Sequence, residues 1–211
     1  MAYDLEEQEH LDAIKAWWAD YGNYIVLAVI ACLLTIAGFQ GWRYYKGQQA
    51  ERAAALFTQL DQAERASEAK KVRDIAAEIL DKYGSTHYAG MAALSAAKAG
   101  FSTGEIEEAK KNLQWVIDKA REEEMRDVAR LRLAGILLDE KKYDEALKLL
   151  SAKSTEAYAA LYADSKGDVL TAQGKPADAS AAYRLALDKS DAASQYRGLI
   201  ELKLDALGEA K

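Results

Sequence analysis

The chain has few of the residues on which most enzyme chemistry depends. Its one cysteine, Cys32, excludes an intramolecular disulfide and lies inside an apolar run. The two histidines, His10 and His87, are too few and too far apart for a zinc site or for a catalytic base with an orienting partner. The nucleotide-binding patterns G-x-G-x-x-G and G-x-x-x-x-G-K-S/T do not occur. We therefore expect no catalytic residue, no cofactor and no metal.

Proline and strand-forming runs are also scarce. Pro176 is the only proline, and stretches rich in valine, isoleucine and threonine are missing. Alanine, leucine, glutamate and lysine dominate, and apolar residues recur at spacings of three and four, which is typical of amphipathic helices. The part of the chain after residue 42 has almost no net charge, so the basic surface that nucleic-acid binding needs is absent. We predict an all-α protein that does not bind nucleic acid.

One long apolar run contrasts with these absences. Residues 21–42 contain no Asp, Glu, Lys, Arg or His. As a helix this run would be about 33 Å long, enough to cross a hydrocarbon core of roughly 30 Å. We predict a transmembrane helix over residues 21–45, surrounded by membrane lipid; a buried core helix is the alternative. Aromatic residues lie at both ends, as they do at the two faces of a membrane: Trp17, Trp18, Tyr21, Tyr24, Phe39, Trp42, Tyr44 and Tyr45.

Residues 1–20 form an acidic segment ahead of the apolar run. They hold six acidic side chains and a single lysine, and so carry most of the formal net charge of −6. Leu11, Ile14 and Trp17 recur at helical spacing in the same segment. We predict a short amphipathic helix over residues 1–20 that leads into the membrane.

The charges beside the predicted span do not settle its orientation. Lys15 precedes the span, whereas Arg43, Lys46 and Arg52 follow it. The positive-inside rule, taken alone, would place the following domain in the cytoplasm. Long domains, however, are translocated largely regardless of charge, so both orientations stay open.

Residues 46–211 show a repeated helical pattern. In four stretches an alanine stands four residues before a larger apolar side chain: Ala76 and Leu80, Ala109 and Leu113, Ala146 and Leu150, and Ala179 and Tyr183. The successive alanines are 33, 37 and 33 residues apart, which is the period of tetratricopeptide repeats with two helices per unit. We predict a tetratricopeptide-repeat-like solenoid of helical hairpins over residues 46–211; a non-repetitive helical bundle is the alternative.

Smaller features support the hairpin arrangement. A small residue is expected on each first helix 12 positions before the repeated alanine, and Ala97, Ala134 and Gly167 stand there. No proline separates the span from the helical pattern of residues 47–65, so the membrane helix is expected to continue into the domain. Residues 194–207 are predicted to form a capping helix.

Two groups of residues are candidates for contacts with other molecules. Stacked hairpins have a concave face lined by their first helices. Tyr88, Met91, Tyr158 and Tyr162 lie on predicted first helices and could line a groove for a partner peptide; hairpin packing is the alternative role.

Inside the span, Ala37 and Gly41 form a small-xxx-small pair. Such a pair lets another membrane helix approach closely, although it also occurs by chance in helices rich in glycine and alanine. We predict transmembrane packing at these two residues.

The layout as a whole resembles the YfgM family, the ancillary subunits of the bacterial SecYEG translocon. The resemblance covers nearly the full chain and is most specific around the span. The residues that carry it are Glu9, Ala13, Ile14, Lys15, Trp17 and Trp18 before the span, and Gly41, Trp42, Arg43 and Tyr44 at its end.

The resemblance implies a single-pass protein of the Gram-negative inner membrane, with a cytoplasmic N-terminus and a periplasmic repeat domain. The implied partners are the SecYEG translocon, the periplasmic chaperone PpiD and newly exported polypeptides. The family has no catalytic residue to transfer to this chain. We therefore expect a non-catalytic interaction protein at the secretion channel; a cytoplasm-facing repeat adaptor is the alternative, and an enzyme with a hidden site is a third hypothesis.

Overall fold

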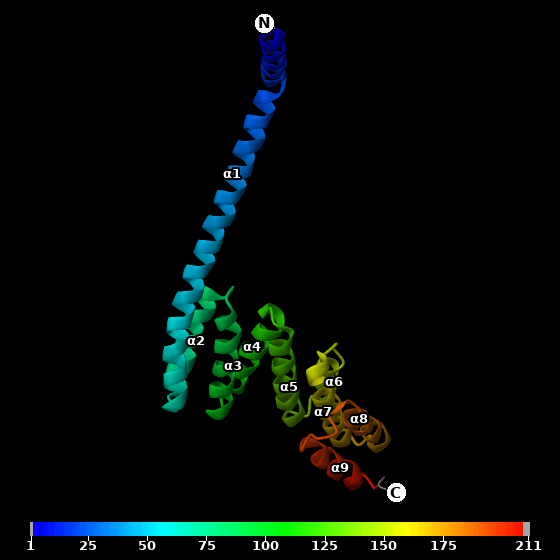
Figure 1. The fold of residues 1–211 in the computed structure, drawn as a ribbon. Helices are drawn as coiled ribbons and strands as arrows, with labels where there is room; N and C mark the ends of the chain where they lie inside the picture. The colour runs from blue at the N-terminus through cyan, green and yellow to red at the C-terminus, as the bar shows by residue number, and fades with distance from the viewer. Residues whose placement is uncertain (1, 209–211) are drawn as a thin grey trace. The chain divides into compact units, whose positions relative to one another are not determined.

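The computed structural model describes residues 2–208, and the side chains of residues 10–208. Met1 and residues 209–211, which belong to the predicted segments 1–20 and 46–211, lie outside the described residues. Every regular element in the described part is helical, which confirms the all-α prediction (Figure 1). The elements are α1 (Ala2–Arg65), α2 (Ala69–Tyr83), α3 (His87–Ser102), α4 (Ile106–Lys119), α5 (Glu123–Asp139), α6 (Tyr143–Leu150), the short 3-10 helix η1 (Glu156–Tyr158), α7 (Ala159–Ala172), α8 (Pro176–Lys189) and α9 (Tyr196–Ala206).

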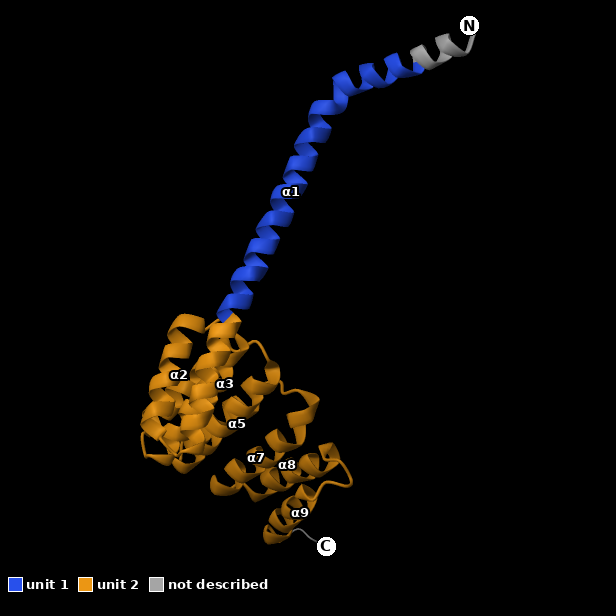
Figure 2. Cartoon of the chain, turned by 60° about the vertical axis from the view of Figure 1, so that its left-hand side comes forward, with its two compact units in different colours: residues 1–49 blue, residues 50–211 orange. Residues whose placement is uncertain are grey.

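The chain divides into two compact units, residues 1–49 and residues 50–211 (Figure 2). Helix α1 belongs to both, since it runs without interruption from Ala2 to Arg65. The expected continuation of the membrane helix into the domain is therefore confirmed, and Gly47 does not end the helix. The predicted limits of the span, 21–45, stay a prediction.

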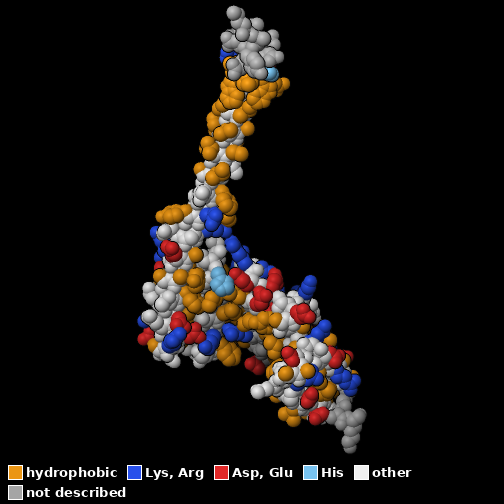
Figure 3. All heavy atoms as spheres, viewed as in Figure 1, with side chains coloured by type: hydrophobic (Ala, Val, Ile, Leu, Met, Phe, Trp, Pro, Cys, Tyr) orange, Lys and Arg blue, Asp and Glu red, His pale blue; other side chains and the backbone are white. Residues whose placement is uncertain are grey.

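The first unit contains an apolar helix that no other described residue buries. Its most apolar window of 18 residues has a mean hydropathy of 2.1, and none of that window is buried. Figure 3 shows hydrophobic side chains over most of this stretch. By length and composition the helix is a candidate membrane span, and the lack of covering chain distinguishes it from a buried core helix.

In the second unit, helices that follow each other in the chain pack side by side (Figure 1). Contacts join each consecutive pair from α2 to α9, and among the first helices α3 contacts α5 and α5 contacts α7. Contacts confined to near neighbours are typical of a solenoid. The predicted stack of helical hairpins is therefore confirmed.

The same turn closes each hairpin. Each turn contains one residue with positive φ, and these residues are 37, 37 and 33 positions apart: Ser67 (58°), Gly104 (82°), Lys141 (61°) and Gly174 (75°). The next residue donates its backbone N–H to the carbonyl five positions earlier, at 2.8–2.9 Å in all four turns. This bond satisfies a helix-terminal carbonyl, as in the Schellman motif. The repeat is thus visible in the backbone as well as in the sequence.

The turns correct the sequence alignment of the first hairpin. Ala109 and Leu113 lie five and nine residues after their turn residue, Gly104. The residues at those distances from Ser67 are Val72 and Ala76, and both are buried. The equivalents of Ala109 and Leu113 in the first hairpin are therefore Val72 and Ala76, and the predicted pair Ala76 and Leu80 lies one helical turn further along the chain. The prediction was wrong there because alanine is so frequent in this chain that the pattern also matches one turn away from the true position.

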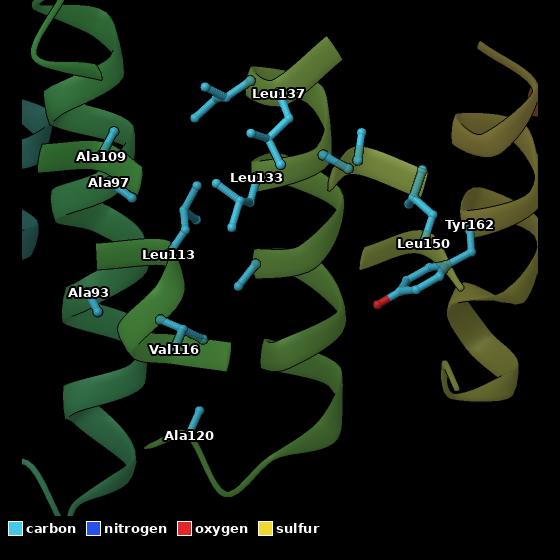
Figure 4. Packing of buried hydrophobic residues seen from close by; sticks show 14 of the residues in the cluster. Ala93, Ala97, Ala109, Leu113, Val116, Ala120, Leu133, Leu137, Leu150 and Tyr162 are labelled. Carbon is cyan, nitrogen blue, oxygen red and sulfur yellow. The ribbon is translucent and has the colours of Figure 1, made fainter. Parts of the chain in front are cut away.

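Small residues let the paired helices approach closely. The repeated alanines Ala109, Ala146 and Ala179 are fully buried. Figure 4 shows Leu113 and Leu133 lying between α4 and α5. They belong to the hydrophobic cluster that joins the hairpin α3–α4 to the hairpin α5–α6.

Gly167 is the tightest of these positions, because a Cβ atom there would overlap the ring of Tyr183. The predicted small residues at positions 97, 134 and 167 thus have the packing role expected of them: Ala97 and Ala134 are buried in the same cluster, and Gly167 is buried against Tyr183.

Candidate functional site

A hollow of about 470 Å³ lies between the first helices α3 and α5, with one residue contributed by α4. We call it the α3–α5 hollow. Its lining consists of Ala97, Lys98, Phe101, Leu113, Arg132, Gly135, Ile136, Leu138 and Asp139. Most of these residues are apolar, so the hollow is suited to an apolar side chain rather than to an ion.

Local sequence explains why this hollow is open. Gly135 has no side chain, and a Cβ atom placed there would meet nothing within 4 Å. Ala97 is the small residue that the repeat requires on α3. Phe101, one turn further along α3, is 51% exposed although it is a large apolar residue. The hollow therefore combines free space with an apolar side chain that has no cover in the described part of the chain.

Charges of both signs border the hollow. Lys98 donates a hydrogen bond from Nζ to Oε1 of Glu64 at 2.7 Å, and Ser95 donates to Oε2 of the same carboxylate at 3.1 Å. The hydrogen bond from Lys98 holds the pKa of Glu64 below its usual range, against the opposing effect of partial burial. Arg132 and Asp139 complete the border. An apolar floor with mixed charges at its edge is suited to a polypeptide segment.

The four residues of the predicted groove lie at different places in the helix array. Tyr88 is half-buried, and its ring lies 5.7 Å from the ring of Phe57 on α1. Met91 is half-buried on α3. Tyr158 packs against the same core cluster to which Tyr162 belongs. None of the four lines the α3–α5 hollow, and their role in binding stays a prediction.

Tyr162 has a clear structural role between α5 and α7. It is 4% exposed, and its hydroxyl donates a hydrogen bond to Oδ1 of Asp127 at 2.8 Å. Burial raises the pKa of Tyr162 to about 12, and the hydrogen bond to Asp127 acts in the same direction. Thr155 donates both its backbone N–H and its hydroxyl to Oδ2 of Asp127, each at 2.8 Å, and Arg130 donates to Oδ1 at 3.2 Å. The carboxylate thereby joins α5 to the start of the next hairpin.

A second buried carboxylate joins α7 to α9. Asp164 on α7 is 2% exposed and accepts hydrogen bonds from the hydroxyl of Tyr196 on α9 and from Nζ of Lys203. Asp168 accepts from Lys203 and from the hydroxyl of Tyr183, each at 2.8 Å. These ion pairs raise the pKa of Lys203 although its partial burial acts in the opposite direction. Sequence reasoning missed both carboxylates. They are 37 residues apart, whereas the turn residues of their hairpins, Lys141 and Gly174, are 33 apart, so the repeat period gave no signal for them.

The remaining candidates are the possible metal ligands and the small-residue pair of the span. No group of three or more His, Cys, Asp or Glu side chains there converges in a way that could hold a metal ion. His87 pairs with Glu122, with 2.8 Å between Nδ1 and Oε1. Ala37 and Gly41 are exposed on α1, and a Cβ atom at Gly41 would meet nothing within 4 Å; packing of another membrane helix there stays a prediction.

An apolar helix followed by hairpins with a shared turn defines a class of protein: a helical-repeat domain attached to a candidate membrane span. A family model described as a tetratricopeptide repeat-like domain matches residues 15–209. Four curated relatives carry the name "Ancillary SecYEG translocon subunit". The one from Neisseria gonorrhoeae (strain ATCC 700825 / FA 1090) is 31% identical and aligns over 98% of this chain and 100% of its own.

Two of the other relatives agree with the first. The protein of Escherichia coli (strain K12) is 29% identical, with 95% of this chain and 96% of its own aligned. The protein of Haemophilus influenzae (strain ATCC 51907 / DSM 11121 / KW20 / Rd) is 27% identical, with 96% of this chain and 98% of its own aligned. The chain therefore belongs to the tetratricopeptide repeat-like family of ancillary SecYEG translocon subunits, and the predicted family membership is confirmed.

Proposed function

We propose that this chain is a non-catalytic ancillary subunit of the Sec translocon. It would cross the bacterial inner membrane once, with its N-terminus in the cytoplasm, and bind the chaperone PpiD, emerging secreted chains, or both, on its periplasmic repeat domain. The observation that carries the proposal is the α3–α5 hollow, an apolar site between first helices that fits one or a few side chains of a polypeptide. The names of the relatives support the assignment to the translocon.

Anchoring explains how a weak site would be useful. A hollow of about 470 Å³ accommodates one or a few side chains and supports modest affinity. Tethering beside the channel raises the effective concentration of emerging chains, so that weak binding becomes frequent occupancy. A tight and selective site would hinder the release of a moving polypeptide.

Photocrosslinking in membranes tests the binding surface. A photoreactive amino acid replaces Phe101 in the hollow, and a matched control replaces Ala77, which is exposed on the second helix α2. We expect adducts with translocon subunits, PpiD or a stalled secreted chain from position 101 and few from position 77. Equal yields from both positions would contradict the proposed surface.

A cytoplasm-facing repeat adaptor is the second candidate, favoured by the basic residues that follow the span. Lys46 lies with its Nζ 4.1 Å from the ring centroid of Trp42, an arrangement suited to a membrane interface. Protease added to intact spheroplasts distinguishes the two orientations. Degradation of the repeat domain supports the translocon proposal, and protection supports the adaptor.

A further inference from the structure

Helix α9 is attached to the array in the same way as the first helix of a hairpin. The Asp127–Tyr162 hydrogen bond joins the first helices α5 and α7. The Asp164–Tyr196 hydrogen bond joins α7 to α9 with the same pair of residue types. In both cases a buried carboxylate on one first helix accepts the hydroxyl of a tyrosine from the next. Helix α9 therefore occupies the position of the first helix in a further hairpin.

The second helix of that hairpin is missing from the described residues. Helices α3, α5 and α7 are each followed by a second helix, α4, α6 and α8, which packs on them. Within residues 2–208, no second helix follows α9. One face of α9 is thus left without the cover that each earlier first helix has.

That face of α9 is apolar. Leu199 is 46% exposed and Leu202 is 65% exposed, and Ala206 is exposed one turn further on. Their spacing of three and four places them on one stripe, whereas the fully buried Ile200 faces the array. A terminal helix that only caps a solenoid has a polar outer face. We call the residues Leu199, Leu202 and Ala206 the α9 stripe.

Exposed large apolar residues are concentrated at this end of the domain. Among the described residues of the second unit, the exposed large hydrophobic side chains are Phe101, Leu185, Leu199 and Leu202. All but Phe101 lie on α8 and α9, which pack on each other. Leu199 and Leu202 lie together on the α9 stripe, and adjacent exposed apolar residues indicate an interaction surface, whereas single ones are ordinary.

The exposed charged residues of α9 are acidic. They are Glu201 and Asp205, whereas Arg197 and Lys203 on the same helix are partly buried. On the neighbouring helix α8, Asp188 and Lys189 are both exposed, so the acidic character comes from α9 itself. A partner with lysine or arginine next to its apolar face would complement these carboxylates, while an anionic membrane surface would be repelled by them. The acidic N-terminal segment of a second copy would be repelled as well.

We propose that the α9 stripe binds a basic amphipathic helix of a partner protein, which takes the place of the missing second helix. The partner helix would resemble α4, α6 and α8 in carrying an alanine four residues before a large apolar residue, with lysine or arginine along its border. The site does not depend on the α3–α5 hollow or on the function proposed for it.

Binding of a synthetic peptide to the full chain in detergent micelles tests this proposal. The probe is a fluorescent helical peptide as long as α4, 14 residues, with alanine and leucine four positions apart on one face and lysines beside them. We expect Leu202→Asp to weaken binding about tenfold or more, which is about 1.4 kcal/mol. Because Leu202 is largely exposed, this variant should keep the wild-type circular dichroism and melting temperature.

Matched controls separate this surface from the other candidate. Phe101→Ala in the α3–α5 hollow is expected to leave peptide binding unchanged, and a peptide with glutamates in place of the lysines is expected to bind at least tenfold more weakly. Equal binding by Leu202→Asp and the wild type, or equal binding of the two peptides, would overturn the proposal. Self-association that depends on Leu202 would assign the stripe to a second copy, and Leu202-dependent binding of phosphatidylethanolamine and phosphatidylglycerol vesicles would assign it to lipid; each would also overturn it.

Discussion

The two halves of the repeat domain join their hairpins by different means. Helix α3 buries only alanine and glycine residues: Ala89, Gly90, Ala92, Ala93, Ala96, Ala97, Ala99 and Gly100. The first helices α5 and α7 each bury an aspartate that accepts a hydrogen bond from a tyrosine of the next first helix. Small residues allow close packing of backbones, whereas a buried carboxylate requires several donors in fixed positions. The second half therefore joins its helices through fully buried carboxylates. In the first half the carboxylate of Glu64, which accepts from Ser95 and Lys98, is only partly buried, and the buried contacts of α3 are made by small residues.

Removing a buried carboxylate is the strongest way to test this difference. Asp127→Ala leaves the donors of Tyr162, Thr155 and Arg130 without their acceptor, so we expect the free energy of unfolding to fall by about 3 kcal/mol. Urea denaturation followed by circular dichroism, with the full chain in detergent, measures the effect. The control Asp74→Ala removes an exposed aspartate on α2 and should change stability by less than about 0.5 kcal/mol. A loss no larger than that of the control would show that the network contributes little.

Crowding Gly167 tests the tightest contact in the second half. Gly167→Ala places a methyl group against the ring of Tyr183, and we expect a loss of about 1–3 kcal/mol in the same denaturation experiment. Gly198→Ala is the matched control, since a Cβ atom there meets nothing within 4 Å. It should be neutral or stabilising because glycine is a poor helix residue. Adding Tyr183→Leu, which copies Leu113 and Leu150 of two other hairpins, should restore part of the loss; failure to do so would contradict the packing explanation.

Substitutions at the last two hairpin turns should change stability in opposite directions. Lys141 has a φ of 61°, a conformation that costs a non-glycine residue about 1 kcal/mol, so Lys141→Gly is expected to stabilise the domain by about that amount. Gly174→Ala, at the equivalent turn with a φ of 75°, should destabilise it by about 1 kcal/mol. Thermal unfolding of the two variants beside the wild type measures both changes. Shifts in the same direction would mean that the turns are not equivalent.

A further difference appears only at alkaline pH. The pKa of Tyr162 is raised from 10.0 to about 12, so the folded state favours the protonated hydroxyl. That contribution to stability is complete below pH 10 and is lost as the pH rises from 10 to 12. Tyr162→Phe should flatten this part of the stability profile. An unchanged alkaline slope in Tyr162→Phe would assign the loss to other groups.

The first half should show the opposite dependence. The pKa of Glu64 is lowered from 4.5 by Lys98, so its contribution is present above pH 4.5 and is lost as the pH falls below that value. Glu64→Gln should reduce the loss of stability in acid and leave the alkaline slope unchanged, as measured by denaturation across the pH range. An acid profile identical to that of the wild type would contradict the role of the Glu64–Lys98 pair.

Sequence reasoning succeeded where a feature depends on residues close together in the chain. The span follows from the absence of charge over residues 21–42, and the hairpins follow from alanines paired with larger residues four positions later. It failed at Asp127 and Asp164, because a charged residue is expected at the surface unless its donors are known. Apart from Arg130, those donors lie 28 to 39 residues away. It also did not find the α3–α5 hollow, whose lining comes from three helices.

The family resemblance was readable without any structure, since it depends on residues around the span and on the repeat period. Whether a given aromatic residue faces a partner or the core was not readable. Tyr158 and Tyr162 stand four positions apart and looked equivalent in sequence, yet only Tyr162 is fully buried, with its hydroxyl on Asp127.

The order of hydrophobic and small residues along this chain was by itself enough to determine that it is helical, that it contains a candidate membrane span and that its domain is a repeat. Only the tertiary structure decided which carboxylates are buried, where free space remains between first helices, and that α9 carries an uncovered apolar stripe. The physical reason is that helix formation and periodicity depend on neighbours a few residues away. Burial and surface exposure depend instead on which distant segments fill the space around a side chain.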